Sequence, residues 1–367
     1  MKRGDEDLRT RQKKGWIWGV IAALIIISIP GIYQFIKTLV TPDIEEVRAT
    51  IESYLYEKYG EEFVVEDIGT RVYKDEEEYV ARIYPKSIIG TKKEWDSYYY
   101  GSASVDRLPF GKLAEPGDDY SYITRNMDME EYLLPEIKKT FGERVLINVD
   151  VAHMVTGDGS WWAGYKSKSL VEMRERIKSN PEKNRIELEL YIYIFDRIED
   201  EAEKEERRQQ IFDFVQYLKG EGLFEYLELG VIFIDERVLA PSYREYRDKI
   251  YSIEEETEVE GEIVYLPPED FRREMSEVLQ KEVEQMSEEE ILERIDRVKK
   301  RELSHEGIRK YNTHYMSWII SKGMMEVNRK SFFDRVKRNQ QLEKYYYNNI
   351  NDISLSTFSD YIYIKNF

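Results

Sequence analysis

Apolar residues recur with helical and strand-like periods along most of the chain. Between residues 44 and 59 they fall at helical spacing, and a strand-like stretch follows at 63–73. The same order of helix, glycine and strand recurs in residues 129–154 and 205–236. A glycine in the left-handed conformation commonly closes a helix, so each helix is expected to end at its glycine. These glycines are Gly60, Gly142 and Gly220.

Further strands are expected between these units. Residues 78–84 and 95–105 are typical of a meander, and residues 186–195 alternate between apolar and polar side chains. A helix followed by several adjacent strands favours a helix packed on a mostly antiparallel sheet. The pattern therefore predicts an α+β fold, with one domain at 43–155 and a second at 156–260.

The pattern changes in residues 267–367, where a mainly helical C-terminal region is expected. One helix is predicted by the apolar spacing after Pro267, and Ser287 with Glu290 forms a capping box that opens a second. Two more helices are expected at 304–327 and 332–347, and a closing strand at 361–367.

One long apolar run precedes these domains. Residues 16–35 carry no charge, and such a helix would span roughly 30 Å, the thickness of the hydrocarbon layer. Cations gather on its N-terminal side, which places that side in the cytoplasm. We therefore expect an N-terminal transmembrane helix over residues 15–40, with basic residues 1–14 in the cytoplasm. The expected membrane-interface residues are Lys13, Lys14, Trp16, Trp18, Tyr33 and Lys37.

A cleaved signal peptide and a buried core helix are the alternatives for this run. A signal peptide has a shorter apolar core and a small-residue cleavage site. The run is longer than that, and residues 28–33 offer no such site. The favoured interpretation is an uncleaved signal-anchor: a single-pass protein of the cell membrane, with the bulk of the chain outside the cytoplasm.

Composition narrows the chemistry. The 367 residues include no cysteine, which excludes disulfides and thiolate catalysis. Charged residues make up 35% and the net charge is −18, but the aromatic content of 13% argues against disorder. Charge is also polarised, because residues 299–344 hold 12 Lys and Arg against 5 Asp and Glu.

No motif predicts a metal, a cofactor or a reaction. His305 and Glu306 begin like the helix of a zinc protease, but the second histidine of H-E-x-x-H is missing. No G-x-S-x-G, phosphate loop or dinucleotide fingerprint is present. A pair of carboxylates for glycoside cleavage stays open, because the many Asp and Glu residues single out no pair.

The loop TGDGSWWAGYK at 156–166 is a candidate ligand-contact loop. Asp158 lies between two glycines, and Trp161 and Trp162 follow. An exposed Trp pair could stack on sugar rings or touch a membrane. The favoured interpretation is a hairpin turn followed by core tryptophans, since Asp-Gly is a common hairpin turn.

The segment 329–349 mixes cations with aromatic residues. Such mixtures bind anions, and outside a cell anionic lipid headgroups or wall polymers are more expected partners than nucleic acid. The alternative is a solvated basic helix face with its aromatic residues packed inward. The candidate anion-binding patch is Arg329, Lys330, Arg335, Lys337 and Arg338.

Three phrases resemble a known group of proteins. They are KKGWIWGV, YLYEKYGEEFVVEDIG and VQYLKGEGLFEYLELGVIFIDE. The chain resembles uncharacterised, membrane-anchored extracytoplasmic proteins of low-GC Gram-positive bacteria over about residues 43–240. The resemblance implies a location and an α+β fold, and no activity.

Three functions follow as hypotheses. The first is a membrane-anchored extracytoplasmic binding or scaffold protein that acts on a protein partner or an anionic envelope polymer. The second is a carboxylate-based enzyme that acts on a cell-wall or surface polymer. The third, by architectural analogy, is a subunit of a secretion or conjugation apparatus.

Overall fold

The fold was analysed in a computed structural model of the chain. The structure describes residues 42–356 with internal gaps. The gaps are residues 74–75, 92, 95, 109–110, 158–160, 164–168, 243–254, 260–261, 267–268, 302–312 and 328–346.

The chain divides into two compact units. Unit 1 comprises the described residues from Pro42 to Ser87 together with those of Gly101–Asp118. Unit 2 comprises the described residues of Ile88–Tyr100 and those from Asp119 onward. These bounds differ from the expected 43–155 and 156–260, because the segment 119–155 belongs to the second unit.

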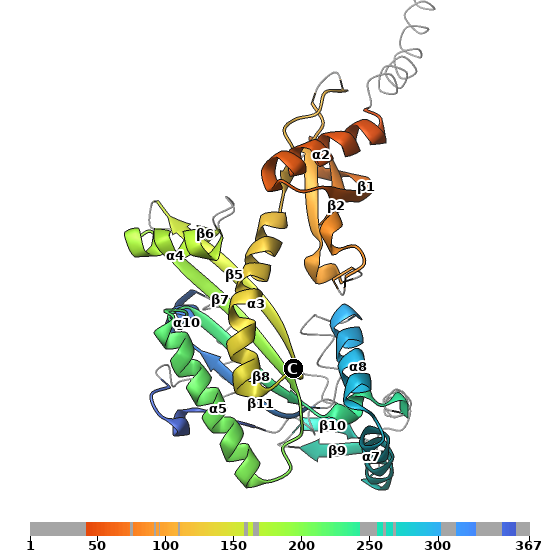
Figure 1. The fold of residues 1–367 in the computed structure, drawn as a ribbon, viewed down its shortest axis with the longest axis vertical. Coiled ribbons are helices and arrows are strands. Elements are labelled where there is room, and N and C mark those ends of the chain that lie inside the picture. Colours follow the sequence, from red (N-terminus) through yellow and green to blue (C-terminus); the bar gives the residue numbers. More distant parts are fainter. Residues whose placement is uncertain are drawn as a thin grey trace, which may run out of the picture. The chain divides into compact units, whose positions relative to one another are not determined.

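Unit 1 is one helix on a four-stranded antiparallel sheet of order β1-β2-β3-β4 (Figure 1). The helix and the long strands lie where the sequence predicts them, although β3 starts later than the expected 95–105. The elements are α2 (Ile44–Tyr59), β1 (Phe63–Tyr73), β2 (Glu76–Pro85), β3 (Gly101–Asp106) and β4 (Gly117–Asp118), with a 3-10 turn, η1 (Lys86–Ile88), after β2.

Local chemistry fixes both ends of α2. The Asp43 side chain accepts a hydrogen bond from the Glu45 N–H, and Gly60 follows the helix with φ 74°. The helix then buries one stripe on one face of the sheet. The core of unit 1 comprises Val47, Ile51, Leu55, Phe63, Val65, Tyr79, Ala81, Ile83, Ala103 and Val105.

Unit 2 is built on a mixed five-stranded sheet of order β11-β8-β7-β5-β6. The pair β7–β8 is parallel, and the crossover between them is helix α5. Because β8 lies inside the sheet, all eight of its residues are buried. The strands are β5 (Val145–Thr156), β6 (Trp161–Ala163), β7 (Asn184–Phe195), β8 (Leu227–Ile234) and β11 (Thr313–Ile320).

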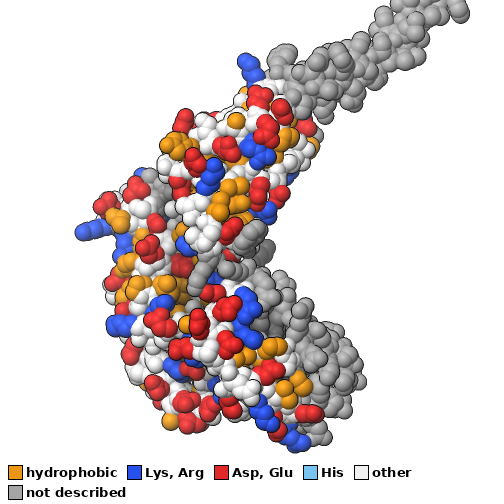
Figure 2. Space-filling view, turned by 45° about the vertical axis from the view of Figure 1, so that its right-hand side comes forward, with side chains coloured by type: hydrophobic (Ala, Val, Ile, Leu, Met, Phe, Trp, Pro, Cys, Tyr) orange, Lys and Arg blue, Asp and Glu red, His pale blue; other side chains and the backbone are white. Residues whose placement is uncertain are grey.

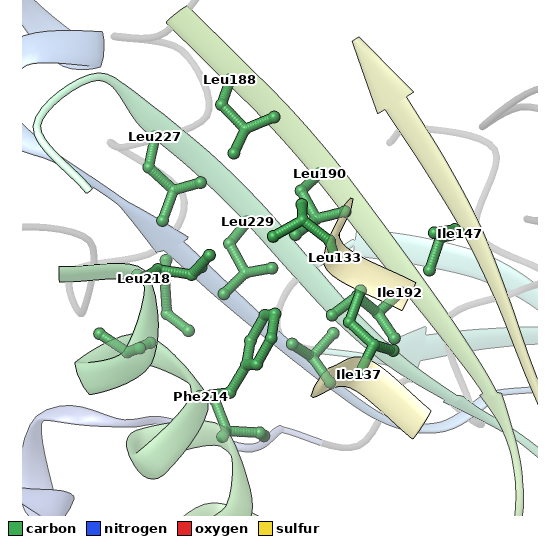
Figure 3. Close-up of a cluster of buried hydrophobic side chains, with 14 of the residues drawn as sticks. Leu133, Ile137, Ile147, Leu188, Leu190, Ile192, Phe214, Leu218, Leu227 and Leu229 are labelled. Atoms are coloured by element: carbon green, nitrogen blue, oxygen red, sulfur yellow. The ribbon is translucent and has the colours of Figure 1, made fainter. Parts of the chain in front are cut away.

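Helices α3, α4 and α5 cover one face of this sheet, which we call the helix face (Figure 1). Figure 3 shows Leu133 and Ile137 of α3 and Phe214 of α5 directed at leucines and isoleucines of β7 and β8. This cluster is the larger core of unit 2. The helices are α3 (Tyr120–Phe141), α4 (Leu170–Ser179) and α5 (Glu201–Gly220).

Two further helices, α7 (Glu269–Glu284) and α8 (Glu288–Arg301), follow one another along the chain and pack on the opposite face of the sheet. We call α7 and α8 the α7–α8 hairpin and this face the hairpin face. Ile291, Ile295 and Val298 of α8 lie in one buried cluster with Tyr193 and Ile232 of the sheet. The expected capping box at Ser287 and Glu290 is present, so the start of α8 is confirmed. The remaining elements are η4 (Glu236–Leu239), β9 (Glu255–Val259), β10 (Glu262–Leu266), α7 (Glu269–Glu284) and α8 (Glu288–Arg301).

The described residues after α8 differ from the expected helix at 304–327. Of that range, residues 313–320 form β11, an antiparallel partner of β8, and the short α10 (Lys322–Val327) is helical. Ile319 is fully buried in the helix-face core, so tertiary pairing outweighs any helical preference. The expected helix at 332–347 and the strand at 361–367 fall outside the described residues, apart from Tyr347.

The described segment after the gap at 328–346 packs on the helix face of the sheet. Tyr347, Ile353 and Leu355 are buried in the helix-face core, and η6 (Ile350–Asp352) lies between them. Arg208 of α5 donates to the carbonyl oxygens of Ile350 and Ile353, at 2.8 and 3.0 Å. This segment therefore belongs to the core of unit 2.

The expected fold class needs a correction at its N-terminal end. None of the helices that the structure describes is long and apolar enough to cross a membrane. The longest, α3 and α5, have 22 and 20 residues, but each carries charged side chains on the face away from the core. The transmembrane, single-pass and signal-anchor part of the prediction is therefore withdrawn, and residues 15–40 lie outside the described part of the chain. The fold is α+β with two main sheets.

Candidate functional site

Polar side chains close the free edge of β5 in unit 2. This strand pairs with β7 along its length but with β6 only at its end, so among the described residues no strand lies beside most of its other edge. The Tyr98 hydroxyl donates to the Val149 carbonyl oxygen at 2.8 Å and accepts from the Val149 N–H at 3.2 Å. The Asn126 side-chain oxygen accepts from the Val151 N–H at 2.9 Å. These side chains satisfy backbone groups that a neighbouring strand would otherwise satisfy.

Tyr98 belongs to a segment that we call the strap, residues 88–100. It connects β2 to β3 along the chain but is part of unit 2. A 3-10 turn, η2 (Ser97–Tyr99), is capped by Asp96, whose carboxylate accepts from the Tyr98 N–H at 3.1 Å. Asp96 is 2% exposed and Tyr99 is 1% exposed, so the strap is anchored by buried groups.

Glu130 of α3 lies between the strap and α8. The Tyr99 hydroxyl donates to its carboxylate at 3.3 Å, and Lys299 Nζ of α8 lies 3.2 Å from Glu130 Oε1. The Lys93 ammonium lies 4.8 Å from the centre of the Tyr99 ring. We call Tyr99, Glu130 and Lys299 the Glu130 node.

Three carboxyl groups stand in one row on the hairpin face. Asp150 of β5 lies opposite Glu189 of β7, and Glu189 lies opposite Glu228 of β8. Like charges in directly opposed positions are unfavourable in a sheet. A hydrogen bond partly offsets the repulsion within this row, because the Tyr191 hydroxyl donates to the Glu228 carboxylate at 2.6 Å.

Burial changes the acid–base properties of this region. It raises the pKa of Asp150 above the ordinary range, and a hydrogen bond from Tyr122 and the charge of Arg125 oppose this rise. Burial likewise raises the pKa of Tyr122 and Tyr98, with added repulsion from Asp150 and Glu130 respectively. The hydroxyl groups of Tyr98 and Tyr122 are therefore protonated at neutral pH and act as hydrogen-bond donors.

Replacing Asp150 by asparagine is expected to increase the free energy of unfolding at pH 7. The amide oxygen still accepts from Tyr122, but the cost of burying a carboxylate is removed. Because the folded pKa is raised, that cost is present above it and disappears as pH falls below the unfolded value of about 3.9. Urea unfolding of both proteins between about pH 4 and 7 measures this difference in the free energy of unfolding. A difference that grows toward low pH would contradict the prediction.

Of the three candidate contact residues Asp158, Trp161 and Trp162, the structure describes the side chain of Trp161. It lies on β6, where its ring stacks on the Arg185 guanidinium carbon at 4.1 Å, and Tyr226 covers Arg185 at 4.5 Å. The Trp161 side chain is half-buried and lies in neither core cluster, and the interpretation of the loop as a turn followed by core tryptophans stays a prediction. Asp158 and the Trp162 side chain lie outside the described part.

The other predicted sites are not placed by the structure. The membrane-interface residues and the candidate basic patch at 329–338 lie outside the described residues, as does His305. His153 lies inside the fold, buried on β5, with its Nε2 3.1 Å from Asn184 Oδ1. Within the described ranges, no three His, Asp or Glu side chains are arranged to hold a metal ion.

Sequence reasoning missed the Glu130 node and the acidic row. Their members come from the strap, α3, β5, β7, β8 and α8, so only the fold brings them together. One local signal was available, because Asn148 and Asp150 interrupt the apolar strand β5 at alternate positions. That alternation indicates a face that is not fully apolar.

An acidic surface lies on the outer face of α2 in unit 1. Its members recur at helical spacing and point away from the buried stripe. Tyr56 is the most exposed aromatic residue of this face, at 57%. We call this the α2 acidic face, and it comprises Glu45, Glu46, Ala49, Glu52, Ser53, Tyr56 and Glu57.

Comparisons with known proteins give one distant structural likeness. No family model matches the chain, and no curated protein matches it. The crystal structure of a DUF5037 family protein from Ruminococcus gnavus ATCC 29149 shares 17% identity, covering 64% of this chain and 87% of that one, with a TM-score of 0.32. At this level the likeness decides neither fold nor function. The resemblance to Gram-positive extracytoplasmic proteins stays a prediction.

Proposed function

We propose that the chain is a binding or scaffold protein without a catalytic role. Its partner is a lysine- or arginine-rich segment of another protein, recognised by the α2 acidic face. The observation that supports this most is the arrangement of four glutamates around Ala49 and Ser53 on one exposed helix face.

The geometry of this face suits a basic segment. Glu45, Ala49, Glu52 and Tyr56 follow one helical stripe, because such positions recur on one side of a helix. Glu46, Ser53 and Glu57 would then form the neighbouring stripe. The small residues leave room for a partner's side-chain stems, and Tyr56 offers a ring for a cation.

The net charge of unit 1 also favours a basic partner. Residues 42–87 and 101–118 contain 16 Asp and Glu against 8 Lys and Arg, a net charge of −8. Figure 2 shows acidic and basic side chains interspersed over the face in view, with hydrophobic side chains in small separate groups. Association through such a surface is governed by charge complementarity and weakens as salt screens it.

The buried polar groups of unit 2 support a structural role. Tyr98 and Asn126 hold the edge of β5, and Glu130 holds the strap and α8. Tyr191 holds Glu228. These polar groups therefore form hydrogen bonds that connect one element of the fold to another.

Exchanging the charge of the α2 acidic face tests the proposal. The full chain is titrated with a labelled peptide of repeating Lys-Lys-Ala-Ala, and the dissociation constant is measured by fluorescence anisotropy. The double variant Glu52→Lys with Glu57→Lys is expected to bind about tenfold more weakly than the unchanged protein, a change of about 1.4 kcal/mol. The difference should shrink as salt rises above about 0.15 M.

A matched variant separates this face from overall charge. Glu175 and Glu182 are exposed in unit 2, and changing both to lysine alters the net charge equally. The control is expected to retain most of the affinity of the unchanged protein. Equal weakening in both variants would mean that the peptide senses only net charge, and the proposal would fail.

The carboxylate-enzyme and secretion-subunit hypotheses stay predictions. Asp150 would be the first residue to test for the former, because burial raises its pKa. The proposed binding role requires no such reaction.

A further inference from the structure

The Glu130 node joins three parts of unit 2 that are distant in sequence. Tyr99 lies in the strap, Glu130 near the middle of α3, and Lys299 near the end of α8. No two of them belong to the same element. A single carboxylate thus connects the strap to the helices on the hairpin face.

The open edge of β5 explains how this connection forms. Leu133 and Ile137 of α3 pack on the helix face, whereas Val298 of α8 packs on the hairpin face. Elements on opposite faces of a sheet are normally kept apart by its strands. In the described part of the sheet, β6 covers β5 only at Met154–Thr156, so Glu130 and Lys299 meet beside the uncovered length of β5.

The carboxylate of Glu130 depends on both partners. Its side chain is 11% exposed, and that of Lys299 is 25% exposed. A buried carboxylate that loses its cation must find another donor, take up a proton or move toward water. Each of these responses changes the acceptor that Tyr99 uses.

We propose that Glu130 couples the strap to the α7–α8 hairpin. A shift of α8 on the sheet then loosens the strap, and the loosened strap uncovers the backbone of β5 at Val149. We call this arrangement the latch. Tyr98 hydrogen-bonds to the backbone of Val149 at the edge of β5, and Glu130 holds the adjacent Tyr99 through its hydroxyl. The uncovered groups are those that an extended peptide uses when it adds a strand to a sheet.

The latch is tested by removing its cation. In Lys299→Met, the amides of the strap and of Val149 are expected to exchange hydrogen about tenfold faster than in the unchanged full chain. Amides of β7 and β8 should be unaffected. Hydrogen exchange with mass spectrometry resolves these segments, and Lys281→Met, an exposed lysine of α7, is the matched control.

A double variant tests the coupling itself. If Tyr99 and Lys299 act through the same carboxylate, the combined effect of Tyr99→Phe and Lys299→Met on strap exchange should be smaller than the product of the single effects. Independent, multiplying effects would overturn the proposal. So would unchanged strap exchange in Lys299→Met, or equal acceleration throughout unit 2, which would mean general loss of stability.

Discussion

Replacing Phe214 by alanine is expected to lower the free energy of unfolding by about 4 kcal/mol. The Phe214 ring is 1% exposed and meets the Phe141 ring edge-on at 5.6 Å between centroids. Figure 3 shows it directed from α5 at the strands, with Leu229 beside it. The change removes this packing and leaves a cavity that a close-packed core refills only in part.

Urea unfolding followed by circular dichroism measures this loss. Val171 of α4 is 66% exposed, so Val171→Ala is a matched apolar truncation outside the core. It is expected to change the free energy by less than about 0.5 kcal/mol. A loss of under about 1 kcal/mol for Phe214→Ala would show that α5 does not pack on the sheet in the way described.

The second large effect is expected at Gly323, at the start of α10. A Cβ there would lie 2.3 Å from the Glu225 carbonyl oxygen and 2.7 Å from a ring carbon of Tyr226. Backbone cannot move aside as a flexible side chain can. We therefore expect Gly323→Ala to cost about 3 kcal/mol, through displacement of α10 from the loop before β8.

Gly220 provides the control for this prediction. It is the last residue of α5, nothing lies within 4 Å of a Cβ built there, and its φ is not positive. Alanine also favours the helix over glycine, so Gly220→Ala should be neutral or stabilising by up to about 1 kcal/mol. If both glycine variants behave alike in urea unfolding, the close approach at Gly323 is not as described.

Local patterns predicted the elements that make their own stabilising contacts. The helix at 44–59 has an apolar stripe, and a left-handed Gly60 ends it, as expected. At the end of α5 the pattern was less exact. Gly220 is still helical, and the left-handed residue is Gly222, with φ 71°. Two glycines in close succession give the chain two places to leave the helix, and the packing of Leu223 in the core selects the later one.

Non-local pairing accounts for what the sequence could not predict. β11 was expected to be helical, but its residues pair with residues of β8 that lie 79 to 92 positions earlier in the chain. The parallel pairing of β7 and β8 within this mostly antiparallel sheet was likewise not predicted. The candidate site depends on the same kind of contact, because Tyr99, Glu130 and Lys299 meet only after three elements have packed.

Zero-length crosslinking is a direct test of basic-peptide binding at the α2 acidic face. The Lys-Lys-Ala-Ala peptide is joined to the full chain with a carbodiimide, which links an amine to a carboxylate in contact with it, and the links are mapped by mass spectrometry. We expect links at Glu45, Glu46, Glu52 and Glu57, and these links should disappear at high salt. Links confined to other carboxylates, such as Glu175 and Glu182, would contradict it.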